Sequence, residues 1–135
     1  MLSSHIHFNG QCEEAFKFYE EVLGGKIDYM ARYEGSPAAD QVPAEWRGKI
    51  LHAHLNLDGG TLMGADVPPG RYSKPQGFNL TISLKEINEG KDIFEKLAAS
   101  GNVVMPFAPT FWSPGFGMCV DRFGIPWMVN CERPQ

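Results

Sequence analysis

Polar and apolar residues alternate at the start of the chain. Within residues 4–8, Ile6 and Phe8 point to one face of an extended segment, and His5 and His7 point to the other. A side-chain period of two is typical of a β-strand with one buried face. We therefore predict a half-buried strand here, with both histidines on its polar face.

After this strand the period of the apolar residues changes. From residue 12 to residue 23 they recur at spacings of three and four, which predicts an amphipathic helix. Glu13 and Glu14 fall in the first turn, where negative charge suits the helix dipole, and Gly24 follows the last apolar residue. We expect Asn9 to cap the N-terminus of this helix.

The first half continues with three more extended segments. Residues 26–33 predict a second strand, and the polar, proline-containing residues 34–48 predict a loop. An Asp-Gly-Gly turn at residues 58–60 then joins a clearly alternating strand, residues 50–57, to a hairpin partner at residues 61–65. The first half therefore has the order strand, helix and three strands.

The second half repeats this order. Alternation and helical spacing predict a strand at residues 78–84, a helix at 86–100 and three further strands at 102–107, 116–120 and 126–131. The helix ends before a glycine, as the first one does. Two halves of the same architecture are thus expected at a period of about half the chain.

This order predicts an α+β fold in which paired βαβββ modules form a cupped mixed sheet. We expect residues 1–135 to form a single domain, with halves at about 1–66 and 77–135 joined by the Pro- and Gly-rich residues 67–76. One helix per half can cover only one face of its sheet, so the other face must be buried elsewhere or line a cavity. Exposed sheet edges also favour association into a homodimer.

The composition is that of an ordinary globular protein and excludes several function classes. The net charge is −4 at pH 7 and no basic stripe is present, so nucleic acid is not an expected partner. No apolar stretch approaches the ~20 residues needed to cross a membrane, and the start of the chain does not resemble a signal peptide. Three cysteines match neither a disulfide framework nor a zinc motif, so we expect a cytoplasmic protein with free thiols.

Several separated motifs carry a family resemblance. They are Phe8-Asn9-Gly10 leading into Glu14-Ala15-Phe16-Lys17-Phe18-Tyr19; His52-Ala53 followed by Leu62-Met63 and Asp66; Thr110-Phe111-Trp112 with Gly115-Phe116-Gly117; and Asp121-Arg122-Phe123-Gly124-Ile125-Pro126-Trp127-Met128-Val129-Asn130. In this order they resemble the PhnB-like branch of the vicinal-oxygen-chelate superfamily, which includes glyoxalases, bleomycin-resistance proteins and dioxygenases. The resemblance covers essentially the whole chain.

The resemblance implies a divalent metal in the enzymes of the superfamily, held by His and Glu from the first and fourth strands of each half. Here the inward positions on those strands are expected to be His5, Met63, Asn79 and Met128, or Ser4 and Phe78 in place of His5 and Asn79 after a one-residue shift of register. At most one of these residues is a good ligand, whereas an open catalytic site needs about three. We therefore expect no metal and no other cofactor.

The name of this branch often invokes a demethylubiquinone methyltransferase. A methyltransferase of the usual class has a Gly-rich turn after the first parallel strand of an open α/β sheet, and this chain has none. Gly115-Phe116-Gly117 lies between a loop and a strand, which does not suit that turn. The sequence therefore does not support methyl transfer.

All four histidines of the chain are expected on one sheet face, because His52 and His54 alternate with apolar residues as His5 and His7 do. One strand should separate the two pairs, which places them roughly 10 Å apart, too far for one mononuclear metal site. A histidine pKa near 6.5 would suit a general acid or base. The alternative is that these are solvated or hydrogen-bonded histidines of a polar sheet face, without a ligand.

We expect the protein to bind a small, partly apolar organic molecule in the cup. Trp112 lies on a Gly- and Pro-rich loop and is expected at the cavity rim or in a dimer interface, whereas Trp127 is expected in the core. Two alternatives remain open: a metal-dependent lyase, isomerase or dioxygenase with ligands drawn from the histidines, and a structural or regulatory dimer with a filled cup. The expected lining of the binding site is His5, His7, His52, His54, Met63, Asn79, Trp112 and Met128.

Overall fold

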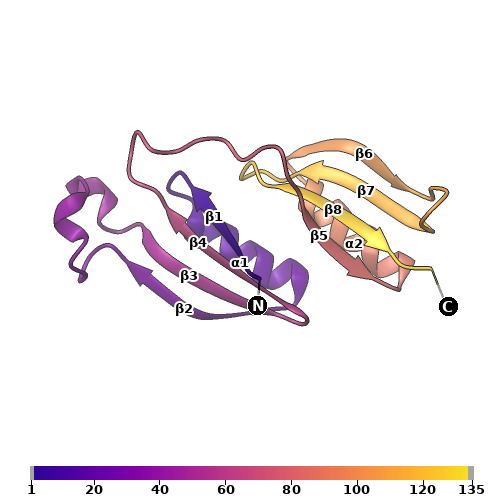
Figure 1. Ribbon diagram of the computed structural model, residues 1–135, viewed down its shortest axis with the longest axis horizontal. Helices are drawn as coiled ribbons and strands as arrows, with labels where there is room; N and C mark the ends of the chain where they lie inside the picture. Colours follow the sequence, from indigo (N-terminus) through magenta and orange to yellow (C-terminus); the bar gives the residue numbers. More distant parts are fainter. Residues whose placement is uncertain (1, 134–135) are drawn as a thin grey trace. The chain divides into compact units, whose positions relative to one another are not determined.

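The computed structural model describes residues 2–133 and divides into two compact units, Met1–Ser73 and Lys74–Gln135. Each unit contains one four-stranded sheet and one α-helix, and we describe each unit by itself (Figure 1). The predicted α+β fold with two βαβββ halves is confirmed. The single-domain organisation stays a prediction.

The first unit has the strand order β1-β4-β3-β2. β1 and β4 are parallel, whereas β4, β3 and β2 are successively antiparallel. Two short 3₁₀ helices, which the sequence did not predict, lie in the loop between β2 and β3. The elements are β1 (Ser4–Phe8), α1 (Cys12–Leu23), β2 (Lys26–Arg32), η1 (Ala39–Gln41), η2 (Ala44–Trp46), β3 (Ile50–Leu57) and β4 (Gly60–Asp66).

The second unit repeats this topology, with the strand order β5-β8-β7-β6 and a parallel pair formed by β5 and β8. Its first strand begins two residues later than predicted, at Leu80. No helix within residues 2–133 has the length and apolarity to cross a membrane. The elements are β5 (Leu80–Leu84), α2 (Ile87–Ala98), β6 (Asn102–Ala108), β7 (Gly115–Val120) and β8 (Pro126–Cys131).

Each helix packs on its sheet at a glycine. A Cβ atom on Gly64 of β4 would lie 2.8 Å from the ring of Phe16 in α1, and one on Gly117 of β7 would lie 2.7 Å from the ring of Phe94 in α2. Any larger residue at these positions would push the helix off the sheet. In both units this glycine marks the face of the sheet that the helix covers.

A buried carboxylate connects the elements of the first unit. Asp66, at the end of β4, is 1% exposed. Its Oδ1 accepts hydrogen bonds from the amides of Gly10 and Cys12, and its Oδ2 accepts one from the amide of Ile50. The prediction that Asn9 caps α1 is wrong: the cap position is Gln11, whose side chain makes no capping bond, and Asp66 binds the first helical amide instead.

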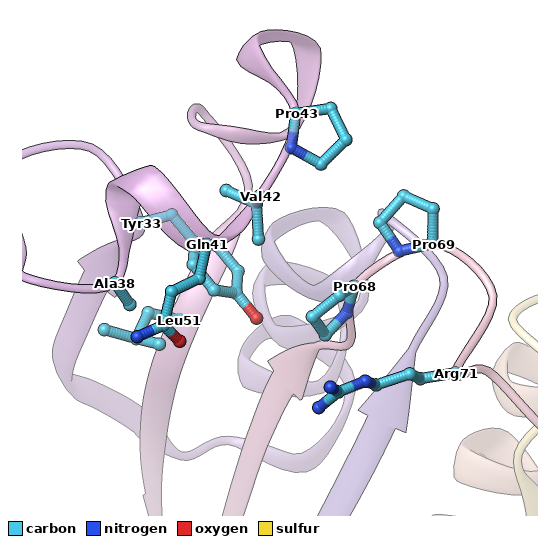
Figure 2. Close-up of a pocket in the computed structure, with 9 residues that line it drawn as sticks. All are labelled: Tyr33, Ala38, Gln41, Val42, Pro43, Leu51, Pro68, Pro69 and Arg71. Atoms are coloured by element: carbon cyan, nitrogen blue, oxygen red, sulfur yellow. The ribbon is translucent and has the colours of Figure 1, made fainter.

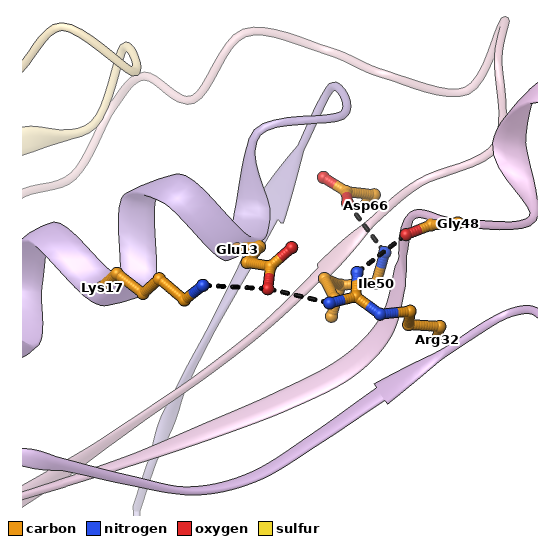
Figure 3. A network of polar contacts seen from close by, with 6 residues as sticks. All are labelled: Glu13, Lys17, Arg32, Gly48, Ile50 and Asp66. Atoms are coloured by element: carbon orange, nitrogen blue, oxygen red, sulfur yellow. Dashed lines mark hydrogen bonds and ion pairs between the residues drawn. The ribbon is translucent and has the colours of Figure 1, made fainter.

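An exposed ion-pair network joins α1 to the neighbouring strands (Figure 3). The Glu13 carboxylate lies 2.8 Å from Nη2 of Arg32 and 3.1 Å from Nζ of Lys17. Arg32 also donates to the carbonyl oxygen of Gly48. The hydrogen bonds from Arg32 and Lys17 lower the pKa of Glu13 to about 2, so this carboxylate stays ionised at neutral pH.

The second unit contains a comparable buried carboxylate. Asp121 Oδ1 accepts from the amides of Phe123 and Ile125, and its Oδ2 accepts from Nε1 of Trp127. Trp127 is 1% exposed, which confirms its predicted place in the core. Asp121 therefore both holds the turn after β7 and supplies the hydrogen-bond partner of a buried indole.

We predict that Asp66→Asn destabilises the protein by about 3 kcal/mol, because an amide NH₂ would face a backbone N–H in place of a charged acceptor. Urea denaturation followed by circular dichroism would measure the loss. The matched control is Asp58→Asn in the exposed β3–β4 turn, for which we expect a change of about 0.5 kcal/mol or less. Equal effects of the two substitutions would contradict the role given to Asp66.

Candidate functional site

The four histidines lie together on the face of the first sheet that is turned away from α1. Gly64, which contacts Phe16 of the helix, pairs with Ile6 and Ala53, so the intervening residues point to the opposite face. The register prediction for this face is thus confirmed. We call the surface formed by Tyr29, His5, His7, His52, His54 and Met63 the histidine face.

Four aromatic rings of the histidine face form a continuous row. The ring centroids of Tyr29 and His52 are 5.9 Å apart, those of His52 and His5 are 5.8 Å apart and those of His5 and His7 are 5.4 Å apart. His5 and His52 are stacked with an interplanar angle of 25°. His5 and His7 meet edge to face at 80° and Tyr29 and His52 are tilted at 49°, so the row offers both ring faces and ring edges to a ligand.

The predicted separation of roughly 10 Å between the histidine pairs is wrong for these rings. β4 does lie between β1 and β3, as expected. However, its residue Ala65, which pairs with His7, carries only a methyl group. The short side chain leaves room for imidazole rings from both neighbouring strands to meet above β4.

The fourth histidine has a different partner. His54 Nδ1 lies 2.5 Å from Oδ1 of Asp28, and the side-chain amide of Asn56 donates to Oδ2 of the same carboxylate. An imidazole that donates to a carboxylate through Nδ1 presents Nε2 as an acceptor, which is the arrangement of a general base. His54 is half-buried, with 29% of its side chain exposed.

Asp28 is not among the site residues predicted from the sequence. It lies in β2 at a register shift between Ile27 and Tyr29, where the strand has one more residue than its partner β3. Such a bulge breaks the alternation on which the face assignment relied. The signal that could have found it is a lone carboxylate in a strand opposite the polar residues His54 and Asn56.

The position of His5 within the row makes its imidazole harder to protonate. Burial, followed by the charges of His7 and His52, lowers the pKa of His5 from 6.5. A second proton close to an existing imidazolium is disfavoured by like-charge repulsion. His5 therefore presents a neutral ring at neutral pH.

Met63 lies between His5 and His54, because it pairs with His5 of β1 and with His54 of β3. Its side chain is half-buried and supplies an adaptable apolar surface among the imidazoles. The structure thus brings together five of the eight predicted site residues on one sheet.

The other three predicted residues lie in the second unit. Asn79 is exposed and precedes β5 by one residue, whereas Met128 of β8 pairs with Thr81, whose hydroxyl lies 3.8 Å from the methionine sulfur. Trp112 is 45% exposed in the loop before β7, and its ring centroid is 5.2 Å from that of Phe116.

The donor set at the first and fourth strands does not suit a hard catalytic metal. His5 and Met63 pair in the first unit, and Thr81 and Met128 pair in the second. One imidazole, one hydroxyl and two thioethers replace the His and Glu ligands that the superfamily resemblance implies. Within residues 2–133 no three His, Cys, Asp or Glu side chains are grouped as metal ligands.

A pocket of about 500 Å³ opens at one end of the first sheet, where β2 and β4 finish and β3 begins (Figure 2). None of the eight predicted site residues lies in it. One wall is formed by the 34–48 loop, whose sequence has no helical or strand periodicity from which a site could be predicted. Its lining is Tyr33, Ala38, Gln41, Val42, Pro43, Leu51, Pro68, Pro69 and Arg71.

Comparison with known proteins identifies the family. The family model described as 3-demethylubiquinone-9 3-methyltransferase matches residues 1–130. The chain belongs to this family. The PhnB-like resemblance of the sequence is thereby confirmed, and the fold is also that of proteins of the glyoxalase, bleomycin-resistance and dioxygenase class.

Three individual proteins are similar to this chain over nearly their whole length. YjdN of Escherichia coli is 33% identical, with 99% of this chain and 97% of YjdN aligned. The structure of PA1353 from Pseudomonas aeruginosa is 39% identical at a TM-score of 0.90, covering 99% of this chain and 98% of the other. A PhnB protein from Bacillus cereus shares the fold at 24% identity and a TM-score of 0.82, with 96% and 98% covered.

We predict that ¹H–¹³C NMR titration will give His5 a pKa below 6.5, and that His52→Ala will raise it, because one like charge is removed. His54→Ala is the matched control, since His54 is not among the causes of the shift. We expect that control to leave the pKa of His5 unchanged within about 0.2. A pKa of 6.5 or above in the unmodified protein would contradict the interpretation.

Proposed function

We propose that this PhnB-like protein binds a small, flat, partly apolar organic molecule on the histidine face. The observation that carries the proposal is the continuous row of rings Tyr29, His52, His5 and His7, with centroid separations of 5.4 to 5.9 Å. A contiguous patch of exposed aromatic rings is unfavourable in water, and a ligand that covers the patch removes this cost. The ring nitrogens of the imidazoles favour a ligand ring that also carries hydrogen-bonding groups.

The Asp28–His54 pair gives this site its chemistry. The carboxylate is 39% exposed and orients the imidazole at 2.5 Å, and Asn56 in turn holds the carboxylate. We propose that Nε2 of His54 accepts a hydrogen bond from the ligand, or takes a proton from it if the protein is an enzyme. The participation of Asn79, Trp112 and Met128 stays a prediction.

We further propose that binding needs no metal, since thioethers stand at two of the positions where ligands are expected. The metal-dependent lyase, isomerase or dioxygenase would instead need several of the four histidines as ligands. Elemental analysis of protein purified without a His-tag distinguishes metal-free binding from the metal-dependent enzyme. One zinc, nickel, iron or manganese per chain, removable by a chelator with loss of an activity, would overturn the metal-free proposal.

The fluorescent probe 2-naphthol tests the binding proposal. We predict that it binds the unmodified protein and that His52→Ala weakens binding about 5- to 10-fold, because one stacking partner is worth roughly 1 kcal/mol. Titrations followed by naphthol emission, before and after chelator treatment, would measure the dissociation constants.

The control is Phe18→Ala, which removes an aromatic ring from α1 on the other side of the same sheet. We expect this variant to bind 2-naphthol as the unmodified protein does. Equal affinities of the unmodified protein and His52→Ala would remove the support for the histidine face and favour the structural or regulatory dimer.

The homodimer is also a proposal. β6 is an edge strand of the second sheet, and its residues Val103, Val104 and Met105 are 41% to 57% exposed. Unpaired edges with apolar side chains favour pairing with another chain. The surface of β6 therefore gives a physical motive for association of two copies.

We predict that light scattering reports a mass of about twice the 15.0 kDa of one chain at micromolar concentration. Val104→Lys should shift the protein toward the monomer, because it places a charge on the edge strand. Ile87→Lys on α2, where the isoleucine is 43% exposed, is the matched control and should remain dimeric. A monomer in the unmodified protein would contradict the proposal.

A further inference from the structure

The pocket at the end of the first sheet contains an unpaired cation. Arg71 is the charged residue of its lining, and within residues 2–133 its guanidinium makes no ion pair with another side chain. The backbone amide of Arg71 donates to the carbonyl oxygen of Pro68, which holds this segment in a turn. Figure 2 shows Pro68, Pro69 and Arg71 across the pocket from the loop residues.

The acidic group beside this pocket makes no ion pair with Arg71. Asp66 is buried, and its two carboxylate oxygens are occupied by three backbone amides. The Tyr33 hydroxyl donates to the carbonyl oxygen of Asp66, so it has no second proton to give. The guanidinium of Arg71 and the side-chain amide of Gln41 therefore supply the polar hydrogen-bond donors of the pocket.

The remaining lining is apolar and rigid. Val42 and Leu51 form part of the wall, and three prolines contribute rings with fixed backbone φ. The loop wall is also held by its own hydrogen bonds, in which Ser36 Oγ donates to the carbonyl oxygen of Tyr33 and the amide of Gln41 to that of Ala38. A preformed wall lowers the entropy cost of binding, and about 500 Å³ suits a small organic molecule.

We propose that this pocket binds a monocarboxylate with a flat apolar body, whose carboxylate pairs with Arg71 and whose body lies against Val42, Leu51 and the prolines. A planar guanidinium matches a carboxylate through two parallel hydrogen bonds. The site is separate from the histidine face, and the proposal does not depend on that function.

Isothermal titration with 2-naphthoate and the neutral 2-naphthamide tests the charge requirement. We expect the unmodified protein to prefer the anion, and Arg71→Gln to weaken 2-naphthoate binding about 10- to 100-fold while leaving 2-naphthamide within about 3-fold. Lys26→Gln is the control, because Lys26 is an exposed cation at the start of β2, the end of that strand away from the pocket. It should bind both probes as the unmodified protein does.

His52→Ala distinguishes this site from the histidine face and should leave 2-naphthoate binding unchanged. The proposal is overturned if Arg71→Gln does not alter 2-naphthoate binding, if both probes bind the His52→Ala variant equally, or if His52→Ala abolishes 2-naphthoate binding. Displacement of 2-naphthoate by inorganic phosphate at an equal concentration would also overturn it, since the pocket would then recognise charge without an apolar body.

Discussion

The arrangement of the first unit depends on one buried carboxylate. The Asp66 carboxylate joins the β1–α1 turn to the start of β3, and the Asp66 carbonyl oxygen accepts a hydrogen bond of 2.7 Å from the Tyr33 hydroxyl. Four backbone or hydroxyl donors thus converge on one residue that is 1% exposed. Because a buried anion is stable only when its hydrogen bonds are complete, these segments must come together for any of them to fold. The histidine strands and the Arg71 pocket are both positioned by this junction.

The two buried aspartates show what sequence analysis can find. Asp121 binds residues two, four and six positions further along the chain, so its role follows from local turn chemistry. Asp66 binds partners 16, 54 and 56 positions away. No local rule connects those segments, and the sequence therefore suggested Asn9 as the cap of α1. The order of the elements was predictable because each has its own period, whereas the long-range polar contacts were not.

The candidate site could likewise be predicted only in its local features. Alternation assigned His5, His7, His52 and His54 to one face, since a strand has only two faces. It could not give the distance between the imidazole rings, which depends on the small side chain of Ala65 and on rotamers. It could not find Asp28 either, because the bulge in β2 breaks the period. The sequence did not predict the pocket for a different reason. An irregular loop forms one wall, and the conformation of such a loop is set by its contacts with the sheet.

A second register shift explains how one sheet can carry two sites of different chemistry. Ala31 of β2 pairs with His52 of β3, but the next residue, Arg32, pairs with Ile50, so Leu51 has no partner of its own. An unpaired residue in a bulge bends the strand and redirects its side chain. Leu51 can therefore line the pocket while its neighbour His52 remains in the row of rings. The bulge separates the pocket that contains Arg71 from the row of aromatic rings over a single residue. The two proposed sites would then select their ligands by charge and shape, and the methyltransferase name of the family gives no guide to either.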